Sequence, residues 1–338
     1  MRNGNKEKAL ACIQRPRVEE NRYSGDDYIN LASNEAAFGS YKHYPYTFPL
    51  YKILSGYFGI DISNITLTRG AEEAISLVYE TYADAGDKTI KISPTFGMVE
   101  VFEKIHQTCE IDLSYNRDLS VPLDRLRSEL HQNPRICYLA NPNNITGSML
   151  NWDDLVSLLD DINDTFFILD ITYLPYTEEY KNIKELFDFK RFPTLILTVS
   201  FSKVYGLAGV RSGCAIASPE IINMLRKTQP MQEINVVAIN ETIKALKYPD
   251  IAHRNISNSS KWKNIFAHEF PDAYIPSKAN FILLKTHLAS DIFNRLLENK
   301  IVTRMEFNHP IMKNIIRISI GTPGIMERVL KIVKKVLC

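Results

Sequence analysis

Apolar and polar residues follow two different periods along the first two thirds of the chain. Short runs rich in apolar and β-branched residues, typical of buried strands, occur at 89–93, 135–140, 165–171 and 194–200. Longer segments with apolar residues three or four positions apart, typical of amphipathic helices, lie at 71–86 and 152–163. Because strands and helices alternate, the pattern predicts an α/β fold in which helices cover both faces of a parallel sheet.

The pattern changes after about residue 230, where the order of elements becomes less regular. Helical spacing is found at 236–246, 259–270, 291–300 and 326–337, and strand-like runs are found at 279–285 and 315–321. This order predicts a separate α+β unit with an antiparallel sheet. We expect a large domain at 28–232 and a small domain of residues 233–338, onto which the short segment 1–27 packs.

The balance of charges argues against a large anionic partner. The 338 residues include 40 lysines and arginines and 39 aspartates and glutamates, so the net charge is only +1. Such a chain has no excess of positive charge with which to bind nucleic acid or an anionic membrane surface. We therefore expect a small-molecule ligand, and neither a nucleic-acid nor a membrane partner.

The cysteines and the apolar runs favour a cytoplasmic protein. The five cysteines are scattered without a C-x-x-C pair, which argues against a disulfide framework and against a zinc site, so no metal is expected. The first 16 residues lack the apolar stretch of a signal peptide, and no run reaches the length of a membrane span.

Two loops that follow expected strands carry groups suited to a ligand, which in open α/β sheets binds beyond the carboxyl ends of the strands. In TRGAEEAI, Gly70 and Ala71 begin a helix whose free N–H groups favour an anion such as phosphate, although such a start is often purely structural. In NPNNITG, the amide of Asn144 would donate to a ligand oxygen, unless the asparagines only cap the turn.

A carboxylate ends the continuous apolar strand TFFILD. Asp170 is costly at this place unless a cation or hydrogen-bond donors meet it. It either caps a neighbouring helix or holds the protonated nitrogen of a pyridine ring, with Tyr173 close enough to reach a ring hydroxyl.

The segment SFSKVYGLAGVRSG places Lys203 eight positions before Arg211 among small and apolar residues. Lysine and arginine are rarely buried without a partner, so both side chains either face solvent or share an anionic ligand. Together with Ser200, Ser202 and the groups above, they suit an aldehyde that carries a ring and a phosphate. Pyridoxal 5′-phosphate has all these groups, and a lysine with a lowered pKa can form a Schiff base with it.

An ordered series of motifs resembles those of fold-type I pyridoxal-phosphate enzymes, specifically the histidinol-phosphate aminotransferase group of the class I/II aminotransferases. The motifs run from about Leu31 to Gly324 and are LASNEAAFG, HYP, TRGAEEAI, SPTFGM, NPNNITG, LDITY, SFSKVYGLAGVRSG, SKANF and IRISIGT. The resemblance implies pyridoxal 5′-phosphate as cofactor. It also implies a large domain with a mostly parallel seven-stranded sheet between helices, plus a smaller α+β domain.

The resemblance further implies a role for each matching cofactor residue. Lys203 would form the Schiff base and move protons, and Asp170 would meet the pyridine nitrogen. Tyr173 and Asn144 would contact the ring hydroxyl, and Phe96 would stack on the ring. The phosphate contacts would come from the amides of Ala71 and Glu72, from Ser200, Ser202 and Arg211, and from Tyr44 of a second subunit. The site would therefore require a homodimer.

Three residues of the second unit are implied in substrate binding. Arg317 of IRISIGT matches the arginine that binds the substrate α-carboxylate, a bidentate contact suited to guanidinium. Arg304 of IVTRMEF matches the position that meets the substrate's phosphate, or else is a solvated rim residue. Asn280 of SKANF either lies near the substrate or pins its strand.

The sequence departs from the family at the substrate entrance. The connection between Glu35 and Tyr44 is much shorter than usual, D-E-A-Y reads DITY, and N-N-P-T-G reads NNIT followed by Gly147. These changes remove no group that handles the cofactor, but they bear on which substrate enters.

We expect an aminotransferase that acts between a phosphorylated amino compound and a 2-oxo acid such as 2-oxoglutarate. Histidinol phosphate is one candidate substrate, and a small amino-alcohol or amino-acid phosphate is another. The alternative is a decarboxylase of a phosphorylated amino acid such as threonine or serine phosphate. A third hypothesis, a regulator without catalytic activity, is disfavoured by the complete set of cofactor residues.

Overall fold

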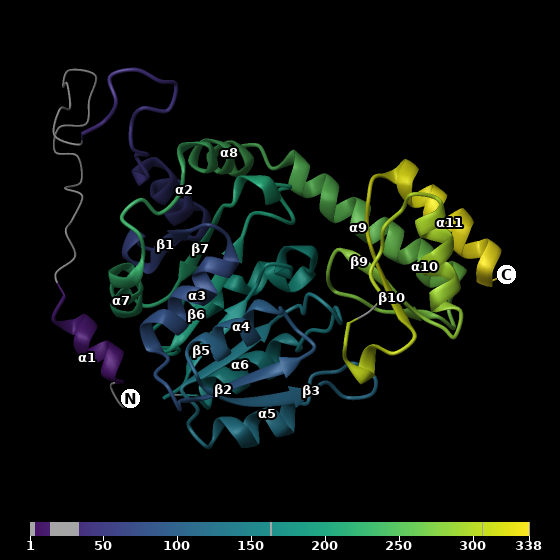
Figure 1. Cartoon of the computed structure of the whole chain (residues 1–338), viewed down its shortest axis with the longest axis horizontal. Helices are drawn as coiled ribbons and strands as arrows, with labels where there is room; N and C mark the ends of the chain where they lie inside the picture. The colour runs from purple at the N-terminus through teal and green to yellow at the C-terminus, as the bar shows by residue number, and fades with distance from the viewer. Residues whose placement is uncertain (1–3, 14–33, 163, 306, 338) are drawn as a thin grey trace.

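The structure is a computed structural model that describes residues 4–13, 34–162, 164–305 and 307–337. A seven-stranded sheet forms the centre of the larger part, and a three-stranded sheet lies near the C-terminus at the other end of the molecule (Figure 1). The long helix α9 (Asp250–Glu269) runs between the two parts.

The larger sheet has the strand order β1-β7-β6-β5-β4-β2-β3. Its strands are β1 (Ile65–Thr68), β2 (Lys88–Ser93), β3 (Cys109–Ser114), β4 (Ile136–Ala140), β5 (Phe166–Asp170), β6 (Leu195–Ser200) and β7 (Gly213–Ile216). β7 is antiparallel to both of its neighbours, whereas the pairs among β2 to β6 are parallel. The expected mostly parallel seven-stranded sheet is confirmed.

Helices cover both faces of this sheet, so β4 and β5 are buried at every position. One face packs against α2 (Phe48–Phe58), α5 (Leu123–Leu130), α6 (Trp152–Asp160) and α8 (Val236–Lys247). The other face packs against α3 (Ala71–Tyr82), α4 (Met98–Ile105) and α7 (Pro219–Thr228). Short 3-10 helices occur at η1 (Ile62–Asn64), η2 (Leu174–Tyr176), η3 (Glu178–Phe187), η4 (Ala208–Val210) and η5 (Pro310–Met312).

The smaller sheet is antiparallel, as expected, with the order β10-β9-β8. It consists of β8 (Tyr274–Ile275), β9 (Phe281–Lys285) and β10 (Ile315–Ser319), and it packs with α9, α10 (Ala289–Glu298) and α11 (Pro323–Leu337). The helix expected at 259–270 is the second half of α9, which begins earlier, at Asp250. No helix within the described ranges is long and apolar enough to cross a membrane.

The short N-terminal helix α1 (Asn5–Ala11) lies against α3 and α7 (Figure 1). Glu7 pairs with Arg135, and the N–H of Asn5 donates to the carboxylate of Asp84 at 2.6 Å. These polar contacts hold the described part of segment 1–27 on the large unit, whereas the sequence suggested packing on the small one.

The junction between the two parts also differs in detail from the expected one. α8 packs against α2 in the core of the large sheet. α9 continues from that core, at Ala252, into the core of the small sheet, at Trp262. A division at residue 232 stays a prediction, and its other boundary, at residue 28, lies outside the described residues.

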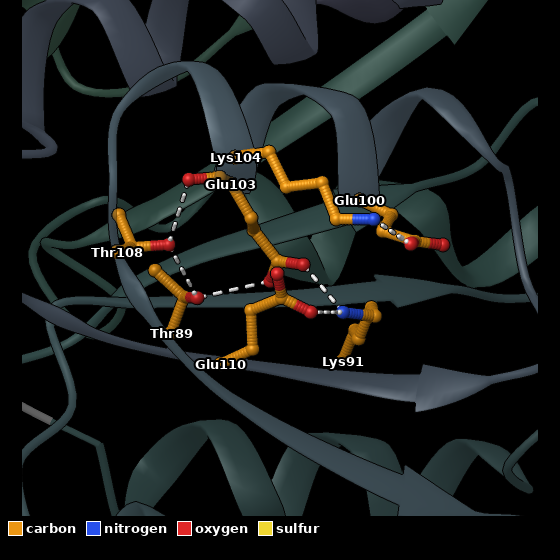
Figure 2. Close-up of polar contacts among 7 residues, drawn as sticks. All are labelled: Thr89, Lys91, Glu100, Glu103, Lys104, Thr108 and Glu110. Atoms are coloured by element: carbon orange, nitrogen blue, oxygen red, sulfur yellow. Dashed lines mark hydrogen bonds and ion pairs between the residues drawn. The ribbon is translucent and has the colours of Figure 1, made fainter.

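A buried lysine attaches α4 to the sheet (Figure 2). Lys91 alternates with Ile90 and Ile92 on β2, so its side chain faces α4. Its ammonium group donates to Glu103 on α4 and, at 2.8 Å, to Glu110 on β3. Lys91 and Glu103 are 3% and 0% exposed, so each charge depends on the other for compensation.

Candidate active site

Several strand ends meet at one edge of the larger sheet. Thr68 of β1 pairs with Gly213 of β7, which in turn pairs with Ser200 of β6. Farther along the same edge, Asp170 of β5 pairs with Ala140 of β4. The topology therefore gathers the expected site residues from distant segments, as the carboxyl ends of parallel strands do in general.

The first turn of α3 lies against this edge because two glycines permit close approach. Gly70 precedes the helix with φ of 91°, and a Cβ at this position would lie 3.3 Å from the guanidinium of Arg211. A Cβ at Gly213 would lie 2.5 Å from the carbonyl oxygen of Val199 and 2.7 Å from the Cα of Gly70. Both are backbone atoms and cannot move without shifting the chain, so a side chain at Gly213 would displace the start of the helix.

Anion-binding groups surround this helix start. Gly70 offers no side-chain cap, so the N–H groups of Ala71 and Glu72 stay available in the first turn. Arg211 lies alongside, with Nη2 3.7 Å from Oε2 of Glu72. Ser202 Oγ is buried, and it has no hydrogen-bond partner within the described part of the chain. These donors fit a phosphate group.

Asp170 lies at the end of β5 and is 9% exposed. Its Oδ2 accepts the hydroxyl of Tyr138 at 3.1 Å, and its Oδ1 accepts the N–H of Thr172 at 3.0 Å. Burial raises the pKa of Asp170, and these hydrogen bonds oppose the rise. A protonated ring nitrogen would favour the carboxylate form. Sequence reasoning missed Tyr138, although its hydroxyl within the apolar strand RICYLA was a visible signal.

The two adjacent asparagines of NPNNITG have different contacts. Asn143 is engaged, because its Nδ2 donates to Thr95 Oγ1 at 3.1 Å and its Oδ1 accepts the N–H of Thr146 at 2.9 Å. Asn144 Oδ1 is buried and finds no hydrogen-bond partner among the residues described. Asn143 therefore shapes the loop, and the side-chain oxygen of Asn144 remains available for a ligand.

Lys203 follows β6 and turns away from the core. Its side chain is exposed, whereas Phe201 in the same segment is 1% exposed. Although the side chain reaches the surface, surrounding protein atoms partly desolvate the amine and lower the pKa of Lys203. The positive charges of Arg317 and Arg211 lower it further, against the opposing effect of Asp170. A neutral amine is the nucleophilic form of lysine, so this environment suits attack on an aldehyde.

Two arginines of the small sheet lie beside one another near this edge. Arg317 on β10 donates from Nη1 to the carbonyl oxygen of Asn144 at 2.6 Å, and its guanidinium lies 5.2 Å from the ring centre of Phe281. Its Nε is buried without a hydrogen-bond partner in the described ranges. Arg304 forms a backbone bridge with Arg317, and both guanidinium groups lie 5.4 Å from the ring of Phe307. Neither phenylalanine was identified from the sequence.

The other expected residues near the edge are held by neighbouring side chains. Tyr173 meets Phe281 edge-on with 6.4 Å between ring centres, and burial raises the pKa of Tyr173 to about 12, so its hydroxyl stays protonated at neutral pH. Asn280 lies beside the Tyr176 hydroxyl and opposes the rise that burial causes in the pKa of Tyr176, which favours the role of Asn280 in pinning the strand. Phe96 is partly exposed just before α4.

Tyr44 lies on the surface of the chain and is 57% exposed. Its N–H donates to Glu35 at 2.7 Å. It lines a hollow of about 570 Å³ together with the start of α8, at Asn235 and Val237. Asp170, Lys203 and Arg317 are not among the residues that line this hollow.

Known proteins support the cofactor that this geometry fits. The histidinol-phosphate aminotransferase of Christiangramia forsetii is 28% identical over 283 residues, which cover 82% of this chain and 80% of that protein. The crystal structure of histidinol-phosphate aminotransferase from Sinorhizobium meliloti in complex with pyridoxal-5′-phosphate has a TM-score of 0.77 at 23% identity, covering 86% of this chain and 82% of the other.

L-threonine-O-3-phosphate decarboxylase from Porphyromonas gingivalis shares the fold as well. Its TM-score is 0.69 at 23% identity, with 87% of this chain and 90% of the other covered. The sequence profile described as aminotransferase class I and II matches residues 18–333, nearly the whole chain. The chain therefore belongs to the class I and II aminotransferase family, and pyridoxal 5′-phosphate is its cofactor.

Proposed function

We propose that the protein is a homodimeric aminotransferase that moves an amino group between a phosphorylated amino compound and a 2-oxo acid such as 2-oxoglutarate. The observation that carries this proposal is the pair Arg304 and Arg317, two guanidinium groups around one aromatic ring beside the Lys203 edge. Two adjacent arginines suit a substrate with two anionic groups, a carboxylate and a phosphate.

The cofactor, when bound, supplies an electron-poor ring that stabilises negative charge at the substrate carbon. Asp170 would keep a proton on the ring nitrogen, and Asn144 and Tyr173 would hydrogen-bond the ring hydroxyl. Phe96 would pack on the ring face. The phosphate would be held by Ala71 and Glu72 at the helix start and by Ser200, Ser202 and Arg211.

Lys203 would act as the group that moves protons. With a lowered pKa, its amine can take a proton from the α-carbon of the substrate and deliver it elsewhere on the bound molecule. Arg317 would hold the α-carboxylate through Nε and Nη2, since its Nη1 already donates to Asn144. Arg304 would contact the substrate phosphate, and Asn280 would support the site by holding Tyr176.

The choice of a phosphorylated substrate is supported by the relatives named histidinol-phosphate aminotransferase. Histidinol phosphate and a smaller amino-alcohol or amino-acid phosphate both carry the required charge. The connection between Glu35 and Tyr44 is shorter than is usual in the family, so the substrate entrance differs. Both the larger and the smaller phosphorylated substrate should therefore be tested.

A second subunit would complete the site with Tyr44. In support, exposed aromatic side chains gather in the same segment, with Phe38 91% and Tyr41 74% exposed. Large exposed aromatic groups close together are typical of a protein interface. The scattered cysteines remain the basis for expecting this dimer in the cytoplasm.

The test is an absorbance titration of the purified protein loaded with pyridoxal phosphate. Addition of glutamate should replace the visible band with that of the aminated cofactor, and 2-oxoglutarate should appear in equal amount. Phosphorylated oxo compounds of different length, added next, should restore the visible band with different rates. A band that ignores glutamate and every phosphorylated amino donor would contradict the proposal.

A decarboxylase of a phosphorylated amino acid is the second candidate, favoured by the fold likeness to the Porphyromonas enzyme. Incubation with threonine phosphate or serine phosphate separates the two functions. Release of carbon dioxide and an amine, with no oxo acid formed, would replace the aminotransferase proposal by this one.

A further inference from the structure

Three tyrosine hydroxyls form a chain beside the segment that carries Lys203. Tyr57 on α2 is the middle member, because its hydroxyl lies 2.9 Å from the hydroxyl of Tyr180 in η3 and 2.9 Å from that of Tyr205. Tyr205 follows Lys203 by only two residues. Hydroxyl groups thus connect α2 and η3 to the segment 201–207.

The same segment is packed along its inner side. Phe201 and Val204 are 1% and 2% exposed, and their neighbour Tyr205 is 9% exposed. Asn255 on α9 donates to the carbonyl oxygen of Val204 at 2.9 Å. Lys203, in contrast, is exposed. Contacts on the inner side therefore decide where the Lys203 amine lies.

The hydroxyls of this cluster act as hydrogen-bonding groups and not as acids. Burial raises the pKa of Tyr205 and the pKa of Tyr180, so both remain protonated over the physiological range. A buried hydroxyl that loses its partner is destabilised, because no water replaces the lost hydrogen bond. Tyr57 is 39% exposed and its contact with Tyr180 lies at the surface, so removal of the Tyr57 hydroxyl would leave one such group, at Tyr205, which is 9% exposed.

We propose that Tyr57 and Tyr205, supported by Tyr180, are positioning residues that hold the Lys203 segment in register with the active-site edge. This inference rests on the proposed function only in taking Lys203 as the reactive amine. In this proposal the hydroxyl chain acts through the backbone of the segment 201–207.

The pKa of Lys203 reports the position of its amine, because charged groups from three elements face it. Arg317 comes from β10, Arg211 follows η4, and Asp170 ends β5. The two arginines lower the pKa of Lys203 together with its partial burial, and Asp170 opposes them. A segment released by loss of the hydroxyl chain lets the amine move away from the two arginines and from the protein atoms that partly desolvate it, so its pKa rises toward the ordinary lysine value.

The experiment measures the pKa of Lys203 in the apoenzyme. Competitive acetylation with acetic anhydride across a range of pH, followed by peptide mass spectrometry, gives the midpoint at which Lys203 becomes reactive. Tyr57→Phe and Tyr205→Phe should move this midpoint upward by about half a pH unit or more. Tyr180 lies at the end of the hydroxyl chain that is farther from Lys203, so Tyr180→Phe should raise the midpoint by less.

Tyr51→Phe is the matched control. Tyr51 lies on the same helix α2, is buried, and its hydroxyl donates to Glu233 at 2.8 Å and accepts the N–H of Leu67 at 3.2 Å. This variant should lose stability in urea while the Lys203 midpoint stays at the wild-type pH. A shift in the control as large as in Tyr57→Phe would overturn the proposal, because general loosening of α2 would explain both.

Unchanged midpoints in Tyr57→Phe, Tyr205→Phe and Tyr180→Phe would also overturn it, leaving the cluster a purely structural role. The measurement uses no cofactor and no substrate. Its result is therefore independent of the absorbance titration that tests the proposed function, and either proposal can fail alone.

Discussion

Lys91 and Lys203 occupy opposite environments within the same large sheet. Lys91 is 3% exposed in the middle of β2, between carboxylates on α4 and β3 (Figure 2). Lys203 lies just beyond the end of β6, exposed, with two arginines as its charged neighbours and one carboxylate against them. One lysine is surrounded by negative charge and the other mostly by positive charge.

Their pKa values move in opposite directions for this reason. Burial by itself lowers the pKa of Lys91, but its hydrogen bonds to Glu103 and Glu110 outweigh burial, and the pKa is raised. Lys203 lacks such compensation, and its pKa is lowered. Burial lowers the pKa of both lysines, so their charged partners distinguish the structural lysine from the reactive one.

Replacement of Lys203 should give the largest effect on function and little effect on stability. Lys203→Met removes the reactive amine, so transamination should fall by a factor of about 10²–10⁴ or more. The apoenzyme should be at least as stable as wild type in urea, because a charge beside Arg317 and Arg211 is gone. Lys203→Arg is the control. It should lose activity as well, but it keeps a positive charge beside Arg317 and Arg211, so its free energy of unfolding should not exceed that of the wild type. Full activity in Lys203→Met would show that Lys203 is not the reactive lysine.

Replacement of Lys91 should show the reverse pattern. Lys91→Met leaves Glu103 buried without a cation, which should lower the free energy of unfolding by about 3–5 kcal/mol in urea denaturation. A double variant, Lys91→Met with Glu103→Leu, should recover most of the loss, since an apolar pair of similar volume needs no compensation. A single variant as stable as wild type would contradict this account of the network.

Gly213→Ala should affect the active-site edge by steric means alone. The new Cβ would lie 2.5 Å from a backbone oxygen of Val199, so the variant should lose about 1–3 kcal/mol of stability and bind pyridoxal phosphate less tightly. Gly209→Ala is the matched control, because nothing lies within 4 Å of its Cβ position. Equal effects of both substitutions on cofactor affinity, measured by fluorescence titration, would refute the proposed close fit.

The smallest expected effect is a change with pH in the stability that Lys91 contributes. The pKa of Lys91 is raised above its ordinary 10.5, so its contribution is fully present below pH 10.5 and is lost as the pH rises through the folded-state pKa. The difference in unfolding free energy between wild type and Lys91→Met should therefore narrow above pH 10.5. A constant difference across urea denaturations at alkaline pH would argue that Lys91 acts by packing alone.

Local sequence was sufficient for much of the candidate site. Asp170 and Asn144 were found because a polar residue at the end of an apolar strand points to the carboxyl edge of a parallel sheet. Asn143 and Asn144 look alike in sequence, however, and only their contacts separate the engaged amide from the available one. Tyr138 was missed because its partner, Asp170, lies 32 residues away.

Local periodicity and local chemistry are enough to predict the alternation of strands and helices, the change of pattern near residue 230 and the order of the motifs. The tertiary structure alone decided the partners of Lys91, the docking of α1 on the large unit and the hydroxyl chain from Tyr180 through Tyr57 to Tyr205. Tyr57 is separated from Tyr205 by 148 positions. Contacts over such distances depend on how whole elements pack, and no local pattern along the chain encodes them.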